Sequence, residues 1–171
     1  VLNRKSLYIL LGKSESDYKP LNKNVIDEIL KKKIKKNKNK FFVLPAGSIS
    51  EKYQSKISKI TNYLKRKKSD FLFITASENN AWLLNIRGHD TKYTPIPNSY
   101  ILIGNNKNIK FFCDLKKLSS KFKNHFDKIE FLDIKICAKT LLKIKKSKFI
   151  IDQNSCSYFF ENIIRKNNEI L

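Results

Sequence analysis

The hydrophobic positions along the chain fall into two patterns, short continuous apolar runs and longer stretches with helical spacing. FLFIT (71–75) is a continuous run of the kind found in strands that are buried on both faces of a sheet. Just before it, apolar residues recur every three or four positions at Tyr53, Ile57, Ile60 and Leu64. This spacing predicts an amphipathic helix of about five turns with one buried stripe. A helix followed by a buried strand indicates an α/β layer architecture.

The same two patterns predict the remaining elements. Apolar runs bounded by Gly, Pro or Asn predict further strands at 6–11, 100–103, 109–113, 131–136 and 148–152. The connection GNNKN (104–108) is typical of a β-hairpin. Ser48 and Glu51 have the spacing of a capping box ahead of the Tyr53 helix. Other helices are expected at 25–30 after an Asn24 cap, at 78–84, at 115–122 after an Asp114 cap, at 138–145, and after a cap at Asn154 or Ser155.

A Lys- and Asn-rich segment, KKKIKKNKNK (31–40), divides the chain into two parts. Charge runs of this kind are more often solvated linkers or helix ends than binding patches. We therefore expect residues 1–40 to be the tail of a preceding domain plus this linker, and residues 41–171 to form one α/β domain. The chain contains no Met, not even at Val1, which favours a piece of a longer protein or a trimmed one.

Composition narrows the class of protein. The chain has 171 residues, of which 41% are hydrophobic, including 12 Phe and 7 Tyr, and this excludes intrinsic disorder. No run approaches the roughly 18 apolar residues of a membrane span. The three cysteines, Cys113, Cys137 and Cys156, form no CxxC pair and therefore indicate neither a disulfide framework nor a zinc site. We expect a reducing, cytoplasmic compartment.

The formal net charge of +21 would ordinarily indicate nucleic acid or an anionic membrane surface as a partner. However, only four of the 36 basic residues are Arg, the side chain that nucleic-acid surfaces favour for its bidentate fork. Lys, Asn, Ile and Phe are abundant together, which is typical of A/T-rich codons. We interpret the charge as compositional and nucleic acid as an unfavoured partner. A basic nucleic-acid-binding domain that uses residues 31–40 and 65–68 is kept as an alternative.

Few residues could carry catalysis. His89 and His125 have no matched carboxylate pattern, and no HExxH, GxSxG or P-loop motif occurs. Cys113 and Cys137 lie in apolar contexts that are typical of core positions. Cys156 begins a predicted helix but has no nearby histidine. The residues alone therefore argue against a self-sufficient enzyme.

The segment Asn85-Ile-Arg-Gly-His-Asp90 is the most distinctive part of the chain, because Arg87 and Gly88 stand together in a sequence poor in both residue types. Arg can bind a carboxylate through its fork, and Gly permits a tight turn or a close approach of the backbone. Two interpretations stay open from residue types alone. One is a binding loop, and the other is an Arg87–Asp90 pair that only fixes the loop.

A longer stretch around this segment, TASENNAWLLNIRGHDTKYTPIPNSYILI (75–103), resembles the middle domain of the three-domain Xaa-Pro aminopeptidases of the creatinase/prolidase superfamily. The resemblance lies in the Thr-Ala start, the AWLLNIRG core (81–88), Asp90, Pro95 and the apolar strand from Tyr100. His89 departs from the family pattern, which usually has Ser. Segments 21–29, 48–64 and 148–163 are similar to the family's flanking elements.

The resemblance implies a mixed β-sheet flanked by helices, the creatinase/prolidase N-terminal fold, without the pita-bread catalytic domain. It implies that the parent releases the N-terminal residue from peptides with Pro in second position. Two divalent metal ions, expected to be manganese, would bind in the catalytic domain, and no metal would bind in this chain. The implied partners are that catalytic domain and the peptide substrates. A homodimer is one of the oligomeric states left open for the parent.

The resemblance also implies a role for the distinctive segment. Asn85, Arg87, His89 and Asp90 would face the catalytic cleft as substrate-entrance residues. Arg87 would shape that entrance or contact a peptide carboxylate or carbonyl. A free-standing interaction module of the same fold, without catalytic function, is the main alternative for the chain as a whole.

Overall fold

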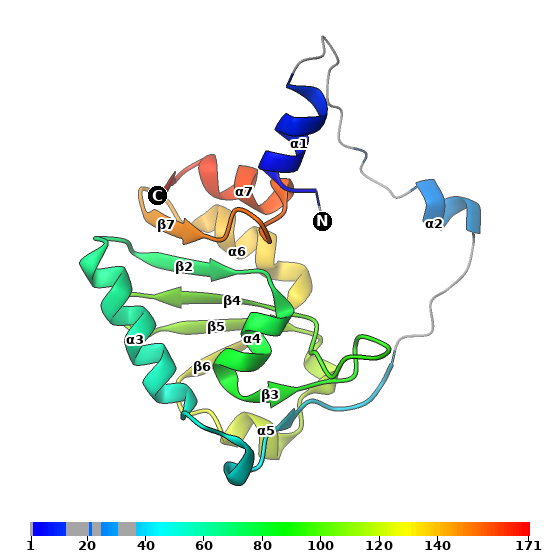
Figure 1. The fold of residues 1–171 in the computed structure, drawn as a ribbon, viewed down its shortest axis with the longest axis vertical. Coiled ribbons are helices and arrows are strands. Elements are labelled where there is room, and N and C mark those ends of the chain that lie inside the picture. Colours follow the sequence, from blue (N-terminus) through cyan, green and yellow to red (C-terminus); the bar gives the residue numbers. More distant parts are fainter. Residues whose placement is uncertain (1, 13–20, 22–24, 31–36) are drawn as a thin grey trace.

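The computed structural model describes residues 2–12, 21, 25–30 and 37–171. A six-stranded mixed sheet forms its centre, in the order β6-β5-β4-β2-β7-β8 (Figure 1). A separate two-stranded ribbon pairs β1 with β3. The strands are β1 (Phe42–Val43), β2 (Phe71–Ile74), β3 (Ile86–Arg87), β4 (Ser99–Gly104), β5 (Ile109–Cys113), β6 (Ile129–Asp133), β7 (Lys148–Ile151) and β8 (Glu169–Ile170).

Helices cover both faces of the sheet (Figure 1). They are α1 (Arg4–Leu11), α2 (Val25–Leu30), α3 (Tyr53–Arg66), α4 (Ser77–Leu84), α5 (Ser120–Asn124), α6 (Cys137–Lys143) and α7 (Tyr158–Arg165), with 3₁₀ turns η1 (Ala46–Ser48), η2 (Leu115–Lys117) and η3 (Ile134–Ile136). One apolar core lies between the sheet and α3, α4 and α5, and a second lies between the sheet and α6 and α7. Alternation along β4 divides its side chains between them, since Ile101 and Ile103 enter the first core and Leu102 the second.

Strand direction brings the loops that follow β2, β5, β6 and β7 to the same end of the sheet. β4 runs antiparallel to both neighbours, β2 and β5, whereas β2, β7 and β8 are parallel to one another, as are β5 and β6. Five strands therefore run in one direction and β4 in the other. The carboxyl ends of β2, β5, β6 and β7 and the start of β4 lie at the same end of the sheet, which is called its carboxyl edge below. Ligands bind at the carboxyl ends of the strands in many open α/β sheets.

The predicted fold class is confirmed. The β4–β5 hairpin forms as expected, with Ile101 opposite Phe111, and Tyr53, Ile57 and Leu64 bury the predicted stripe of α3. The helix has 14 residues, about four turns and not five. The strand expected at 131–136 is β6 at 129–133, followed by the turn η3.

The strand expected at 6–11 is wrong, because these residues lie in helix α1. The Asn3 side chain caps that helix by accepting a 2.7 Å hydrogen bond from the Ser6 amide. Arg4 joins it to α7 through a 2.6 Å ion pair with Glu161. An apolar run this short does not distinguish a strand from a helix, and the cap decides the outcome.

Two predicted caps and one predicted helix also differ from the structure, while the Asp114 cap is confirmed. Ser48 lies in η1 and does not cap α3, while Glu51 binds Ser55 and Lys59 instead. The helix expected at 115–122 is split into η2 and α5, capped by Asp114 and Ser119 respectively. Ser157, and neither Asn154 nor Ser155, caps α7. The predicted Asn24 cap and residues 31–36 of the predicted linker lie outside the described residues, and the domain boundary at residue 40 stays a prediction.

Candidate functional site

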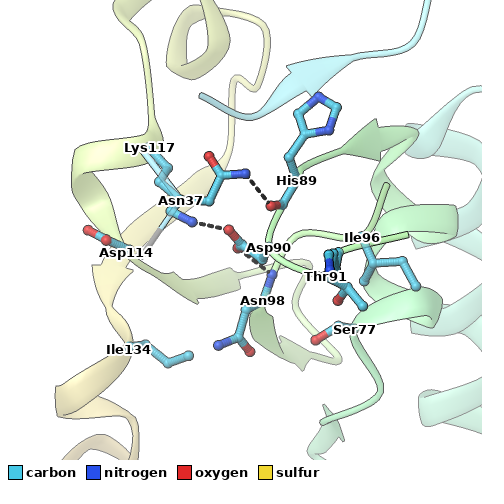
Figure 2. A pocket seen from close by; sticks show the side chains of 11 residues that line it. Asn37, Ser77, His89, Asp90, Thr91, Ile96, Asn98, Asp114, Lys117 and Ile134 are labelled. Carbon is cyan, nitrogen blue, oxygen red and sulfur yellow. Dashed lines mark hydrogen bonds and ion pairs between the residues drawn. The ribbon is translucent and has the colours of Figure 1, made fainter. Parts of the chain in front are cut away.

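A pocket of about 690 Å³ lies at the carboxyl edge of the sheet (Figure 2). Its wall combines the loop after β3, the first residue of α4, the turn after β5 and η3. Nine of the eleven residues that line it are polar or charged. The residues that line it are Asn37, Ser77, His89, Asp90, Thr91, Lys92, Ile96, Asn98, Asp114, Lys117 and Ile134.

Gly88 fixes the path of the loop after β3. A Cβ atom at this position would lie 2.9 Å from the Phe41 ring and 2.9 Å from the Cα of Pro97, closer than real Cβ contacts allow. The Gly88 amide donates to the Pro95 carbonyl at 3.2 Å, which closes the loop on itself. The close backbone approach that glycine permits is therefore what this position uses.

Asp90 is the anchored charge of the pocket. Its Oδ1 forms an ion pair with the Nζ of Lys117, and its Oδ2 accepts a 2.8 Å hydrogen bond from the Asn98 amide (Figure 2). The two charged side chains are only 11% and 10% exposed. The Arg87–Asp90 pair considered from the sequence is thus wrong, because Asp90 is paired with Lys117. Nothing in a chain so rich in Lys distinguishes Lys117 in advance.

His89 also lines the pocket but is exposed. Its imidazole points away from the Asp90 carboxylate (Figure 2) and packs 5.7 Å from the Phe42 ring. Its backbone carbonyl accepts a 2.7 Å hydrogen bond from the Asn37 amide side chain. His89 and Asp90 are therefore the two predicted site residues that the structure brings to the pocket.

Asn85 and Arg87 lie outside the pocket wall. Asn85 ends α4 in the left-handed region, with φ 55°, and its buried side chain bonds to the Glu51 carbonyl and to Lys56. Arg87 is half-buried on the short strand β3, and its Nη1 donates to the carbonyls of Ile86 at 2.8 Å and Ala81 at 3.5 Å.

The described residues carry little reactive chemistry. No three His, Cys, Asp or Glu side chains among them are grouped closely enough to hold a metal ion. Burial raises the pKa of the thiols of Cys113, Cys137 and Cys156 to about 12, so that they are neutral and shielded. In the same part of the chain, no helix has the length and apolarity needed to cross a membrane. The polar residues that line the pocket can form hydrogen bonds and ion pairs.

Comparison with protein families gives a match to the creatinase/prolidase N-terminal domain over residues 32–171. The Xaa-Pro aminopeptidase ApepP of Drosophila melanogaster is 27% identical over 168 residues, which cover 94% of this chain and 27% of that protein. Xaa-Pro aminopeptidase 1 of Dictyostelium discoideum is 31% identical over 87 residues, 51% of this chain and 14% of its own length. The chain spans about a quarter of the curated relatives that it matches over most of its length.

Solved structures show the same fold. The X-prolyl aminopeptidase of Caenorhabditis elegans, described as a cytosolic enzyme with a di-nuclear active site, superposes with a TM-score of 0.79 at 22% identity. The superposition covers 88% of this chain and 26% of that enzyme. A creatinase/prolidase-like N-terminal domain from Corynebacterium diphtheriae gives a TM-score of 0.51 at 14% identity, over 70% of this chain and 94% of that domain.

Proposed function

The chain belongs to the creatinase/prolidase N-terminal domain family, and from this premise we propose that it is a non-catalytic middle domain of a metal-dependent Xaa-Pro aminopeptidase. The parent would release the N-terminal residue from peptides with Pro in second position. The observation that carries the proposal is the similarity to Xaa-Pro aminopeptidase ApepP over 94% of this chain but only 27% of that protein.

The chemistry of the reaction would reside elsewhere in the polypeptide. The described residues include no metal-binding group, and the C. elegans neighbour is described as having a di-nuclear active site. We place two divalent metal ions, manganese by preference, in a catalytic domain outside these 171 residues, where they would activate water and polarise the scissile carbonyl. The catalytic domain and the peptide substrate would be the partners of this chain, in a cytoplasmic and homodimeric parent.

The pocket at the carboxyl edge would contribute to the substrate entrance. The Lys117–Asp90 pair holds the loop after β3 in place, and the exposed His89 stands on the same loop. A peptide offers carbonyl and amide groups that match the polar side chains of this wall. Arg87 would serve the entrance from the adjoining strand β3, and Asn85, at the end of α4, would act through its internal hydrogen bonds.

The test compares the 171-residue chain with the longer polypeptide that carries it. With manganese, the longer polypeptide is expected to cleave Arg-Pro-Pro after Arg and to leave Arg-Ala-Pro intact, and a chelator should abolish cleavage. The 171-residue chain is expected to cleave neither peptide. Cleavage by the 171-residue chain alone, or none by the longer polypeptide, would overturn the proposal. A native protein of 20.1 kDa in its source cells would favour the interaction-module alternative.

The entrance role has its own test in the longer polypeptide. His89→Ala is expected to raise KM or lower kcat/KM for Arg-Pro-Pro without changing the melting temperature, because the side chain is exposed. His125→Ala is the matched control, since His125 is also exposed but does not line this pocket. Equal kinetics for both variants and the unsubstituted enzyme would remove His89 from the entrance.

A further inference from the structure

We propose that Arg87 binds a carboxylate, at a site formed with Lys56, Phe42 and Trp82 where α4 ends and β3 begins. The carboxylate would be either the C-terminus of a peptide substrate or an acidic side chain from another part of the polypeptide. The first source rests on the proposed function, and the second does not. The site is separate from the pocket that contains Asp90, since none of its four residues lines that pocket.

The first observation is the state of the Arg87 guanidinium. Within the described part of the chain, Arg87 forms no ion pair, although it is half-buried. Arg4 and Arg165, by contrast, both bind the buried carboxylate of Glu161. Only the Nη1 of Arg87 takes part in a hydrogen bond among the described residues, and its acceptors are backbone carbonyls. The Nε and Nη2 edge of the fork is left for a ligand, and that edge matches a carboxylate.

A second cation, Lys56, reaches the same junction between α4 and β3. Lys56 is 4% exposed, and its Nζ donates to the Trp82 carbonyl at 2.6 Å and to the Oδ1 of Asn85 at 2.7 Å. Burial lowers the pKa of Lys56, the charge of Glu51 opposes that shift, and the nearby charge of Arg87 lowers the pKa further. The Glu51 carboxylate itself is bonded to Lys59 and Ser55. No carboxylate among the described residues contacts either cation, so that the two charges form a local positive potential that an anion would offset.

Two exposed aromatic side chains, Phe42 and Trp82, lie at this junction. Phe42 lies opposite Arg87 in the β1–β3 register and is 41% exposed. Trp82 is 59% exposed, and its ring centroid lies 4.1 Å from the Nζ of Lys56. Apolar rings beside a charged group exclude part of the water, and they strengthen a hydrogen bond between charges. These exposed rings therefore favour a ligand that combines a carboxylate with an apolar body.

The number of available donors favours a carboxylate over a phosphate. Two of the three Lys56 hydrogens are already used by protein oxygens, so the ligand would meet a single guanidinium edge. One such edge satisfies the two oxygens of a carboxylate in a planar, bidentate pair. A phosphate group has further oxygens and a larger charge, which this site would leave without partners.

Trp82 is the only tryptophan of the chain and reports directly on the site. The 171-residue chain would be titrated with N-acetyl-alanyl-alanine and with its C-terminal amide, and Trp82 fluorescence would be recorded. A saturable change is expected with the free acid and none with the amide. Arg87→Gln should weaken the response to the acid about tenfold or more, and Arg87→Lys should weaken it less. Arg66→Gln, an exposed arginine on α3, is the charge-matched control and should behave like the unsubstituted chain.

An equal response to acid and amide would overturn the proposal. An Arg87→Gln variant that binds like the unsubstituted chain, with unchanged circular dichroism and melting temperature, would also overturn it. Neither result depends on peptidase activity. If the longer polypeptide fails to cleave X-Pro peptides, the proposed function fails while the fluorescence result still decides whether Arg87 binds a carboxylate.

The longer polypeptide separates the two sources. For a substrate carboxylate, kcat/KM for Arg-Pro-Pro should exceed that for its amide about tenfold, and Arg87→Gln should remove the difference through KM. For a carboxylate within the polypeptide, the acid and amide should be cleaved equally, and Arg87→Gln should lower the melting temperature of the longer polypeptide but not of the 171-residue chain. If Arg87→Gln changes neither quantity, the proposal is overturned.

Discussion

The buried ammonium of Lys56 donates a 2.7 Å hydrogen bond to the Oδ1 of Asn85, 29 positions further along the chain. Asn85 has φ 55° at the end of α4, and its Nδ2 in turn donates to the Glu51 carbonyl at 2.9 Å. α3 thereby fixes the point at which α4 ends. The direction of β3, and with it the position of Arg87, follows from this junction.

Replacing Lys56 with Met should destabilise the fold, because it leaves the buried acceptors of Trp82 and Asn85 without their donor. The expected loss is about 1–3 kcal/mol in the free energy of unfolding. Urea denaturation measures it. Lys59→Met is the matched control on the same helix: Lys59 is 71% exposed and pairs with Glu51, so the expected loss is below about 1 kcal/mol. Equal losses for the two variants would mean that the buried hydrogen bonds of Lys56 contribute nothing specific.

Gly88→Ala should destabilise the protein, since its Cβ would meet Phe41 and Pro97 at 2.9 Å. The loss should be about 1–3 kcal/mol, the usual range for overpacking. Gly47→Ala serves as the control, because nothing lies within 4 Å of a Cβ at that position. Thermal unfolding of both variants distinguishes the two sites. If Gly88→Ala has the same melting temperature as the unsubstituted protein, the loop can accommodate the added Cβ without loss of stability.

The Asp90–Lys117 ion pair should show strong energetic coupling, because both side chains are nearly buried. Removing one partner alone leaves the other charge buried and should cost about 3–5 kcal/mol. In a double-mutant cycle with Asp90→Ala and Lys117→Ala, the coupling energy is expected to be about 1–3 kcal/mol. Urea denaturation measures the free energy of unfolding of each variant. If the losses in the two single variants add up to the loss in the double variant, Asp90 and Lys117 do not interact energetically.

The three thiols should resist alkylation in the native protein. Burial raises the pKa of Cys113, Cys137 and Cys156 from 9.0 to about 12, and all three side chains are fully buried. Iodoacetamide should therefore modify none of them near neutral pH until urea unfolds the chain. Mass spectrometry counts the modified sites. Rapid labelling of any one thiol in the folded protein would contradict its burial.

These raised pKa values also predict a pH dependence of stability. Below pH 9 the thiols are protonated in both the folded and unfolded states, so their contribution to stability is fully present. As the pH rises from 9 towards 12, the unfolded thiols ionise first and the free energy of unfolding falls. Each buried thiol should lower the free energy of unfolding by about 1 kcal/mol per pH unit in this window. Cys156→Ala should show a shallower decline, and an unchanged slope would exclude that thiol as a cause.

Local sequence patterns were sufficient to predict those helices and strands whose formation depends on neighbouring residues in the chain. The stripe on α3, the β4–β5 hairpin and the two-sided burial of β2 follow from side-chain periodicity and turn chemistry alone. The AWLLNIRG segment was sufficient to indicate the family. The run at 6–11 was misread as a strand, because its helical state depends on a cap at Asn3 and an ion pair with Glu161 on α7.

The partners of the charged groups were decided only by the tertiary structure. The sequence singled out Arg87 and Asp90, but it offered no means of choosing Lys117 from so many lysines, or of placing Lys56 beneath Trp82. The chain by itself thus determined which residues are apolar, where most of the helices and strands form, and which loop is unusual. The packing of α3, α4 and η2 against the sheet decided which charges meet, because ion pairs between distant segments depend on where the backbone brings them and leave no periodic signal in the sequence.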